Sequence, residues 1–172
     1  MSKLQVHTAR ITYGGPDRFD ITWKSSEGDG KCFCPSGKLL GFGRSMRAQS
    51  ERRRTAALET RSSEEQRARL EEVESFEQWA WLAYRSRYEE AMRISYKERR
   101  QVWDRLLARE RVVLVCYCTD PERCHRRVLA NILAKLGAVD CGELEAELQR
   151  PRRASHKPIS GTLFSGKSKE GA

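Results

Sequence analysis

The chain has 172 residues, of which 38% are hydrophobic and 33% charged, and a formal net charge of +9. This length suits one ordinary domain with an appendage, and the apolar content is too high for a wholly disordered chain. The sequence has neither a run of about 18 apolar residues nor an apolar signal core at its N-terminus, so we expect no membrane partner and a cytoplasmic location. In that compartment six cysteines are better explained as thiols, metal ligands or catalytic groups than as a disulfide framework.

The first 43 residues predict two short strands. Residues 4–11 alternate between apolar and polar side chains, as a half-buried strand does, and residues 19–23 form a second candidate strand. Gly37, Gly41 and Gly43 then favour a flexible connection over a helix.

A segment of mixed charge follows, with eight arginines and seven glutamates between residues 44 and 74. The balance of signs argues against a nucleic-acid patch and favours a helical excursion from the core over residues 44–75. Ser62 and Glu65 have the spacing of a capping box, which predicts that the second half is helical. We place no chemistry in this segment.

Two further capping signatures predict two more helices, one opening at Ser75 and one at Ser95. In the first of these helices apolar and aromatic residues recur at helical spacing, which is more typical of a core than of a cofactor site. The residues of this stripe are Trp79, Ala80, Ala83, Tyr84, Tyr88, Ala91 and Met92.

The strongest fold signal lies in the last third of the chain. Residues 112–116 form a continuous apolar run, typical of an interior strand of a parallel sheet. An amphipathic helix ending before Gly137 and a short strand at 138–141 complete a βαβ unit. We therefore predict an α/β fold over residues 1–149, with a small, largely parallel sheet flanked by helices and a mixed-charge helical insertion.

The C-terminal segment, residues 150–172, is predicted to be a disordered basic tail. Six basic residues and one acidic residue give it +5 of the +9 net charge. Such a tail can contact a phosphate backbone through counterion release, or it can serve only as a solvated, charged end.

The candidate functional site is the segment from Cys116 to Arg126, between the interior strand and the last helix. Ligands in α/β sheets bind beyond the carboxyl ends of the strands, where Arg10 and Tyr13 are also expected. With Asp120 as one option for the N-cap and Pro121 as the first helical residue, Cys124 lies in the first turns of the helix.

The start of that helix favours an anion, because free N–H groups and the positive end of the helix dipole meet there. The same field, with the nearby arginines, lowers the pKa of a thiol and favours its thiolate. His125 is a candidate proton donor or acceptor. The plainer alternative is that Cys124 and His125 are buried structural residues.

Metal binding is the main rival interpretation, and zinc is the candidate cofactor. Cys32, Cys34, Cys118 and Cys124 are the candidate ligands, and Cys116 and His125 extend the donor set. The spacing is weak support, because the chain has no Cys-x-x-Cys pair and 82 residues separate Cys34 from Cys116. A redox pair of Cys118 and Cys124 is a third option.

The cysteine segment also carries a family resemblance. The strand ending in cysteine, followed by Asp120-Pro121-Glu122 and Cys124-His125-Arg126, resembles the domain of unknown function 488 (DUF488) family of bacterial and phage genomes. The resemblance extends over about residues 5–145 and implies a small α/β fold with the cysteine loop at a shared site. Many relatives carry a glutamate at the position of Cys118, which raises the alternative that Cys118 is here a metal ligand.

Three hypotheses follow. The first is an enzyme acting on a phosphate-bearing nucleotide or nucleic-acid substrate, with Cys116, Cys124 and His125 as catalytic groups. Its candidate substrate contacts are Arg10, Tyr13, Asp20 and Arg126. The second is a zinc-stabilised, non-enzymatic module that binds nucleic acid or a partner protein. The third is an adaptor that uses the charged segment and the tail.

Overall fold

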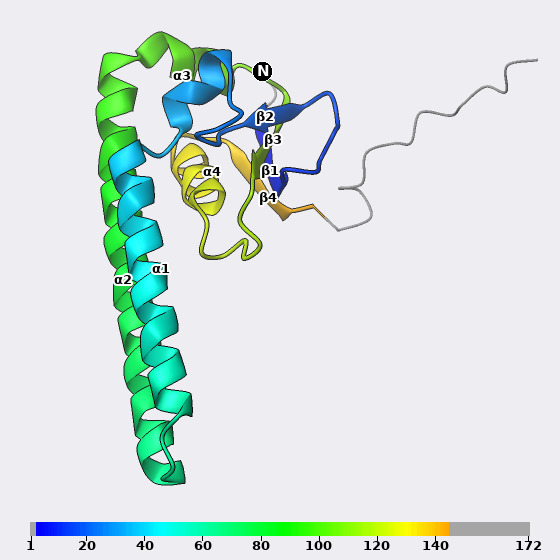
Figure 1. Ribbon diagram of the computed structural model, residues 1–172. Helices are drawn as coiled ribbons and strands as arrows, with labels where there is room; N and C mark the ends of the chain where they lie inside the picture. Colours follow the sequence, from blue (N-terminus) through cyan, green and yellow to red (C-terminus); the bar gives the residue numbers. More distant parts are fainter. Residues whose placement is uncertain (1–2, 145–172) are drawn as a thin grey trace, which may run out of the picture.

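The computed structural model describes residues 3–144, so the predicted tail at 150–172 lies outside the described residues. Figure 1 shows a small sheet packed against helices, with two long helices projecting from it. In chain order the elements are β1 (Gln5–Arg10), β2 (Arg18–Asp20), the 3-10 helix η1 (Gly28–Phe33), α1 (Gly37–Leu58), α2 (Ser63–Glu98), α3 (Arg100–Leu107), β3 (Arg111–Cys116), α4 (His125–Lys135) and β4 (Val139–Glu143).

The sheet has four strands in the order β2-β3-β1-β4, and every pairing is parallel. The predicted α/β fold with a parallel sheet is therefore confirmed. Because parallel strands end at the same edge, Arg10 at the end of β1 is the register partner of Cys116 at the end of β3. The predicted meeting of these two strand ends is also confirmed.

Strand β3 is interior, and its residues from Val112 to Cys116 are all buried. Alternate side chains enter two clusters, because successive residues of a strand point to opposite faces. Val112 and Leu114 pack with aromatic residues of η1, α2 and α3 and with apolar residues of α4, whereas Val113 and Val115 pack with Tyr13 and Leu144. The unbroken apolar run thus reflects burial on both faces.

Helices α1 and α2 form an antiparallel hairpin that extends away from the sheet (Figure 1). The predicted charged helical excursion is confirmed, and Ser62 is the N-cap of α2, accepting a hydrogen bond from the backbone N–H of Glu65. Only the C-terminal half of α2 reaches the core, through Tyr88 and Met92. Among residues 3–144, no helix has the length and apolar character needed to cross a membrane.

The glycine-containing segment is helical, contrary to the prediction of a flexible connection. Ser36 caps α1, and its Oγ accepts a hydrogen bond from Leu39 N at 3.2 Å. A good N-cap and packing against α2 outweigh the low helix propensity of three glycines. Gly43 serves this packing, because a Cβ added there would lie 3.3 Å from the Tyr84 ring.

Two of the predicted capping sites are wrong. Ser75 lies inside α2 and donates to the carbonyl of Glu71, so the helix continues past it. Ser95 lies near the end of α2, where its Oγ accepts a hydrogen bond from Trp103 Nε1 at 3.2 Å. The predicted aromatic stripe is also partly wrong, because Trp79 is 56% exposed, whereas Tyr88 and Met92 of the same stripe are buried.

Candidate metal centre

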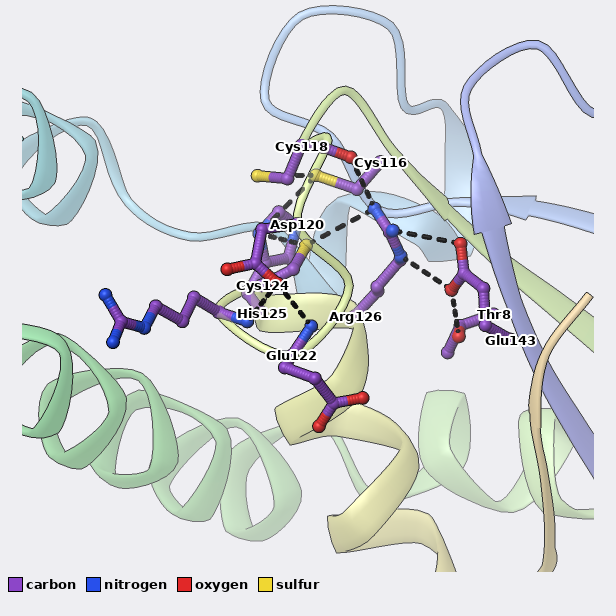
Figure 2. A network of polar contacts seen from close by, with 10 residues as sticks. Thr8, Cys116, Cys118, Asp120, Glu122, Cys124, His125, Arg126 and Glu143 are labelled. Carbon is purple, nitrogen blue, oxygen red and sulfur yellow. Dashed lines mark hydrogen bonds and ion pairs between the residues drawn. The ribbon is translucent and has the colours of Figure 1, made fainter. Parts of the chain in front are cut away.

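The loop from β3 to α4 gathers three cysteines and a histidine (Figure 2). Cys116 ends β3, Cys118 lies in the loop, and Cys124 is the extended N-cap of α4, which begins at His125. The option of an N-cap at Asp120 is wrong, because the N-cap of α4 lies four residues after it. The Asp120 carboxylate instead forms a turn within the loop, where it accepts hydrogen bonds from Glu122 N and Arg123 N. The turn at Asp120 folds the chain back and brings Cys124 toward the end of β3.

The four donor atoms Cys116 Sγ, Cys118 Sγ, Cys124 Sγ and a ring nitrogen of His125 all lie within 4.8 Å of one another. The sulfurs of Cys116 and Cys118 are 3.6 Å apart, and His125 Nδ1 lies 3.7 Å from Cys116 Sγ and 4.0 Å from Cys124 Sγ. In a tetrahedral zinc site with Zn–S bonds of about 2.3 Å, neighbouring sulfurs lie about 3.8 Å apart. This group, called here the Cys3His cluster, therefore has the separations of a tetrahedral metal site.

The His125 ring is oriented as a metal ligand. Its Nε2 lies 3.1 Å from the backbone carbonyl of Ile21, an acceptor, so Nε2 carries the proton and donates it. The Nδ1 lone pair then faces the cysteine sulfurs. Histidine ligands usually donate their second ring N–H in this way, which fixes the tautomer. Burial lowers the pKa of His125, so the ring is neutral at neutral pH, as ligation requires.

The three thiols differ in pKa. Interactions with the thiols of Cys116 and Cys124 lower the pKa of Cys118, and the charge of Arg126 acts in the same direction. Interaction with Cys118 raises the pKa of Cys116 to about 11, and contacts with the other two thiols raise that of Cys124. Of the three thiols, Cys118 therefore loses its proton most readily, and it is also the one of the three that is only half-buried.

A buried arginine stands behind the cluster. The Arg126 side chain is 0% exposed, and its Nη1 donates to the Cys118 carbonyl at 2.9 Å and to Cys124 Sγ at 3.6 Å. Its other nitrogens form two hydrogen bonds with the Glu143 carboxylate, at 3.0 and 3.2 Å, and Thr8 donates to the same carboxylate. Figure 2 shows this chain of contacts from β1 and β4 through α4 to the sulfurs.

The other two predicted metal ligands lie apart from the Cys3His cluster. Cys34 Sγ is within hydrogen-bonding distance of Ser26 Oγ and the Thr22 carbonyl, and Cys32 Sγ is 3.0 Å from Ser95 Oγ. Of the predicted ligand set, the structure therefore brings together Cys118 and Cys124, and Cys116 and His125 complete the group. Cys32 and Cys34 lie near η1 instead, in contacts of their own.

The predicted substrate contacts are dispersed. Arg126 is buried in its ion pair with Glu143. Tyr13 packs on the far face of the sheet and donates to Asp17. At the end of β2, burial of Asp20 is outweighed by hydrogen bonds from Ser25 and Thr22, which lower the pKa of the carboxyl. Arg10 is exposed at the end of β1.

A cavity of about 990 Å³ opens in front of the cluster. Its walls come from the loop after β2, the first half of α1, the middle of α2 and the cysteine loop. None of the four predicted substrate contacts lines it, but Lys24, Arg44 and Arg47 do. Sequence reasoning missed these residues, because nothing in their spacing distinguishes Arg44 and Arg47 from the other arginines of the charged segment.

Comparison with known proteins agrees with the cysteine motif. A family model described as the active DUF488-N3 subclade, DUF488-N3a, matches residues 65–137. The chain resembles the DUF488 family. No curated protein and no solved structure matches it. The DUF488-N3 match runs from the start of α2 to just past the end of α4, so it contains the whole Cys3His cluster and excludes Cys32, Cys34 and the strands β1 and β2.

Proposed function

We propose that this protein is a zinc-binding module, in which Cys116, Cys118, Cys124 and His125 hold one Zn²⁺. The mutual proximity of these four donor atoms, all within 4.8 Å, is the observation that carries the proposal. Three sulfurs and one imidazole are a common donor set of structural zinc sites. The zinc ties the cysteine loop to the end of β3 and the start of α4, and so fixes the wall of the adjoining cavity.

The charges around the cluster support this proposal. Zn²⁺ with three thiolates and a neutral imidazole carries a net charge of −1, which is costly in a buried site without compensation. The Arg126 guanidinium, which also pairs with Glu143, lies close enough to lower the electrostatic cost of this charge, with Nη1 3.6 Å from Cys124 Sγ. None of the six cysteines, all within residues 3–144, forms a disulfide. A reducing compartment suits that state, and we propose a cytoplasmic site of action.

Elemental analysis of purified protein tests the proposal. We expect one zinc per chain, its loss in Cys124→Ser, and its retention in the matched control Cys141→Ser, whose thiol is exposed on β4 outside the cluster. Zinc absent from the wild-type protein after expression in zinc-containing medium, or present equally in both variants, would overturn it.

A second candidate is an enzyme that acts on a phosphate-bearing nucleotide or nucleic-acid substrate in the cavity. The observation that favours it is the position of Cys118, a half-buried thiol with a lowered pKa that lines the cavity. In this candidate Cys118 is the nucleophile, since Cys116, Cys124 and His125 are buried. Thiolates are the reactive form of cysteine.

Alkylation with iodoacetamide separates the two candidates. The enzyme predicts that protein as purified is alkylated first at Cys118, at a rate that zinc chelation leaves unchanged. The zinc module predicts protection of Cys118 until a chelator removes the metal. Mapping the modified residue by mass spectrometry, before and after chelation, gives opposite results for the two functions.

A further inference from the structure

The cavity in front of the Cys3His cluster is lined by segments far apart in sequence. Lys24 follows β2, Arg44 and Arg47 lie on α1, Tyr84 lies on α2, and Tyr117 lies in the cysteine loop. Its volume of about 990 Å³ falls within the range of small-molecule sites, about 300–1,000 Å³. The hairpin therefore contributes a wall to the cavity.

The positive charges of this wall are uncompensated. Among the described residues, Lys24, Arg44 and Arg47 form no ion pair and no side-chain hydrogen bond. The two acidic residues of the wall are both engaged by protein groups. Glu77 accepts from Ser50 and Arg54 and pairs with Arg123 at 3.5 Å, and Asp120 accepts two backbone N–H groups. With Arg123, four cationic side chains line the cavity and outnumber its two carboxylates and the negative charge of the cysteine cluster, so the field is on balance positive and suits a phosphate group.

Aromatic side chains line the same cavity as these charges. Trp23 is 60% exposed and Tyr117 54% exposed, and their loops meet where Tyr117 Oη lies 3.5 Å from Ser25 Oγ. Deeper in the wall, the Trp81 and Tyr84 rings stack with centroids 5.9 Å apart. Exposed aromatic faces next to unpaired arginines are the surface on which nucleobases stack while cations hold the phosphate.

The hydroxyl of Tyr84 adds a polar contact within the cavity. Within residues 3–144 it forms no hydrogen bond, and no buried side-chain oxygen there lacks a partner. The hydroxyl is therefore open to the cavity and free to bond a ligand. The backbone of α1 approaches the ring closely at Gly43, where a Cβ would lie 3.3 Å away.

We infer that this cavity binds a nucleoside phosphate, with the phosphate on Arg44 and Arg47 and the base stacked on Trp23. The ligand is either a free nucleotide or the terminal nucleotide of a single strand. The inference rests on the proposed function in one respect, because the zinc holds the loop that carries Tyr117. Arg44 and Arg47, which belong to the charged segment 44–75, thereby acquire a role in ligand binding.

Calorimetric titration of the full chain tests the inference with three probes, namely adenosine 5′-monophosphate, ribose 5-phosphate and a short 5′-phosphorylated single-stranded oligonucleotide. Base stacking predicts that the nucleotide binds roughly tenfold more tightly than ribose 5-phosphate. The phosphate site is removed in Arg44→Gln/Arg47→Gln and the stacking face in Trp23→Ala.

Matched controls lie on the same hairpin. Arg52→Gln/Arg67→Gln removes the same charge outside the cavity, and Trp79→Ala removes an equally exposed tryptophan, 56% exposed. We expect each cavity variant to weaken nucleotide binding by roughly tenfold, with each control within about twofold of the wild type. All these side chains are exposed, so the variants should fold, which thermal unfolding checks.

The outcomes separate the sources of the ligand. Binding of adenosine 5′-monophosphate alone indicates a free nucleotide, and binding of the oligonucleotide, lost in the cavity variants, indicates a strand end. Three results would overturn the inference. These are binding of none of the probes, a loss of affinity in the control variants equal to that in the cavity variants, or an affinity for ribose 5-phosphate equal to that for adenosine 5′-monophosphate. Zinc content measured on the same samples separates the two failures. Failure of the nucleotide inference alone leaves zinc at one per chain, whereas failure of the zinc proposal does not.

Discussion

At the scale of single residues, the four members of the Cys3His cluster differ in how many protons they must lose to bind a metal. His125 is kept neutral by burial, and the neighbouring thiols lower the pKa of Cys118, so that this thiol loses its proton most readily. Cys116 and Cys124 hold their protons, since their pKa values are raised. We therefore expect zinc binding at neutral pH to displace protons from two thiols, those of Cys116 and Cys124.

This difference predicts the pH dependence of zinc affinity. Because only deprotonated thiols bind zinc, affinity falls as pH falls, by about 100-fold per pH unit when two protons are released. Competition with a chelator of known affinity, between about pH 6.5 and 8, measures the slope. A slope corresponding to three protons would show that Cys118 is a protonated thiol in the metal-free protein, and a slope near zero would contradict thiolate ligation.

The buried Arg126 gives a second prediction at this scale. Glu143→Gln removes the carboxylate that compensates a guanidinium with 0% exposure, and the Glu143 side chain is itself only 26% exposed. We expect a loss of about 2–4 kcal/mol in the free energy of unfolding. In the matched control Glu65→Gln, which breaks an ion pair with both side chains about half exposed, the loss should stay below about 1 kcal/mol. Urea unfolding measures both, and equal losses would contradict the structural role of Arg126.

At the scale of elements, the α1–α2 hairpin is the main addition to the sheet. Within the hairpin, α1 approaches α2 closely at Gly43, where an added Cβ would lie 3.3 Å from the Tyr84 ring. Gly41, two residues earlier, has nothing within 4 Å of an added Cβ. The two glycines thus differ in the space available for a side chain, although both lie inside α1.

Alanine substitution of these glycines should have unequal effects. Gly41→Ala should stabilise the protein by about 0.5–1 kcal/mol, because alanine favours the helix at no steric cost. In Gly43→Ala that gain is reduced or reversed, since the Tyr84 ring must shift to admit the methyl group. Urea unfolding of the two variants is the measurement, and equal stabilisation of both would contradict the close contact of Gly43 with Tyr84.

Some of these elements could be predicted from the sequence alone, and others could not. The run from Val112 to Cys116 predicted an interior parallel strand, because burial on both faces leaves no polar positions. The sequence could not place the start of α4, since Asp120 and Pro121 have the chemistry of a helix start but form a separate turn. Nor could it predict that Arg44 and Arg47 line the same cavity as the cysteine loop, because that arrangement depends on the path of the hairpin.

At the scale of the whole molecule, the zinc proposal links the site to global stability. The four ligands come from β3, its loop and α4, and α2 contributes Tyr88 and Met92 to the same core as α4. A ligand that binds only the folded state stabilises all elements that unfold together. The hairpin should therefore lose its helical structure in the same transition as the sheet.

Removal of zinc should lower the stability of the whole chain. At free zinc about 1,000 times its Kd, the folded state gains about 4 kcal/mol, so chelation should lower Tm markedly. Thermal unfolding followed by far-ultraviolet circular dichroism, with buffered zinc and with a chelator, measures the shift. An unchanged Tm, or a hairpin that melts separately from the sheet, would contradict the coupling.

The most direct test of the account is X-ray absorption at the zinc edge of the purified protein. The Cys3His cluster predicts three sulfur neighbours at about 2.3 Å and one nitrogen at about 2.0–2.1 Å. In Cys124→Ser that coordination shell should be lost, and in Cys141→Ser it should be unchanged. A shell containing only oxygen and nitrogen, or protein without zinc, would contradict the central claim.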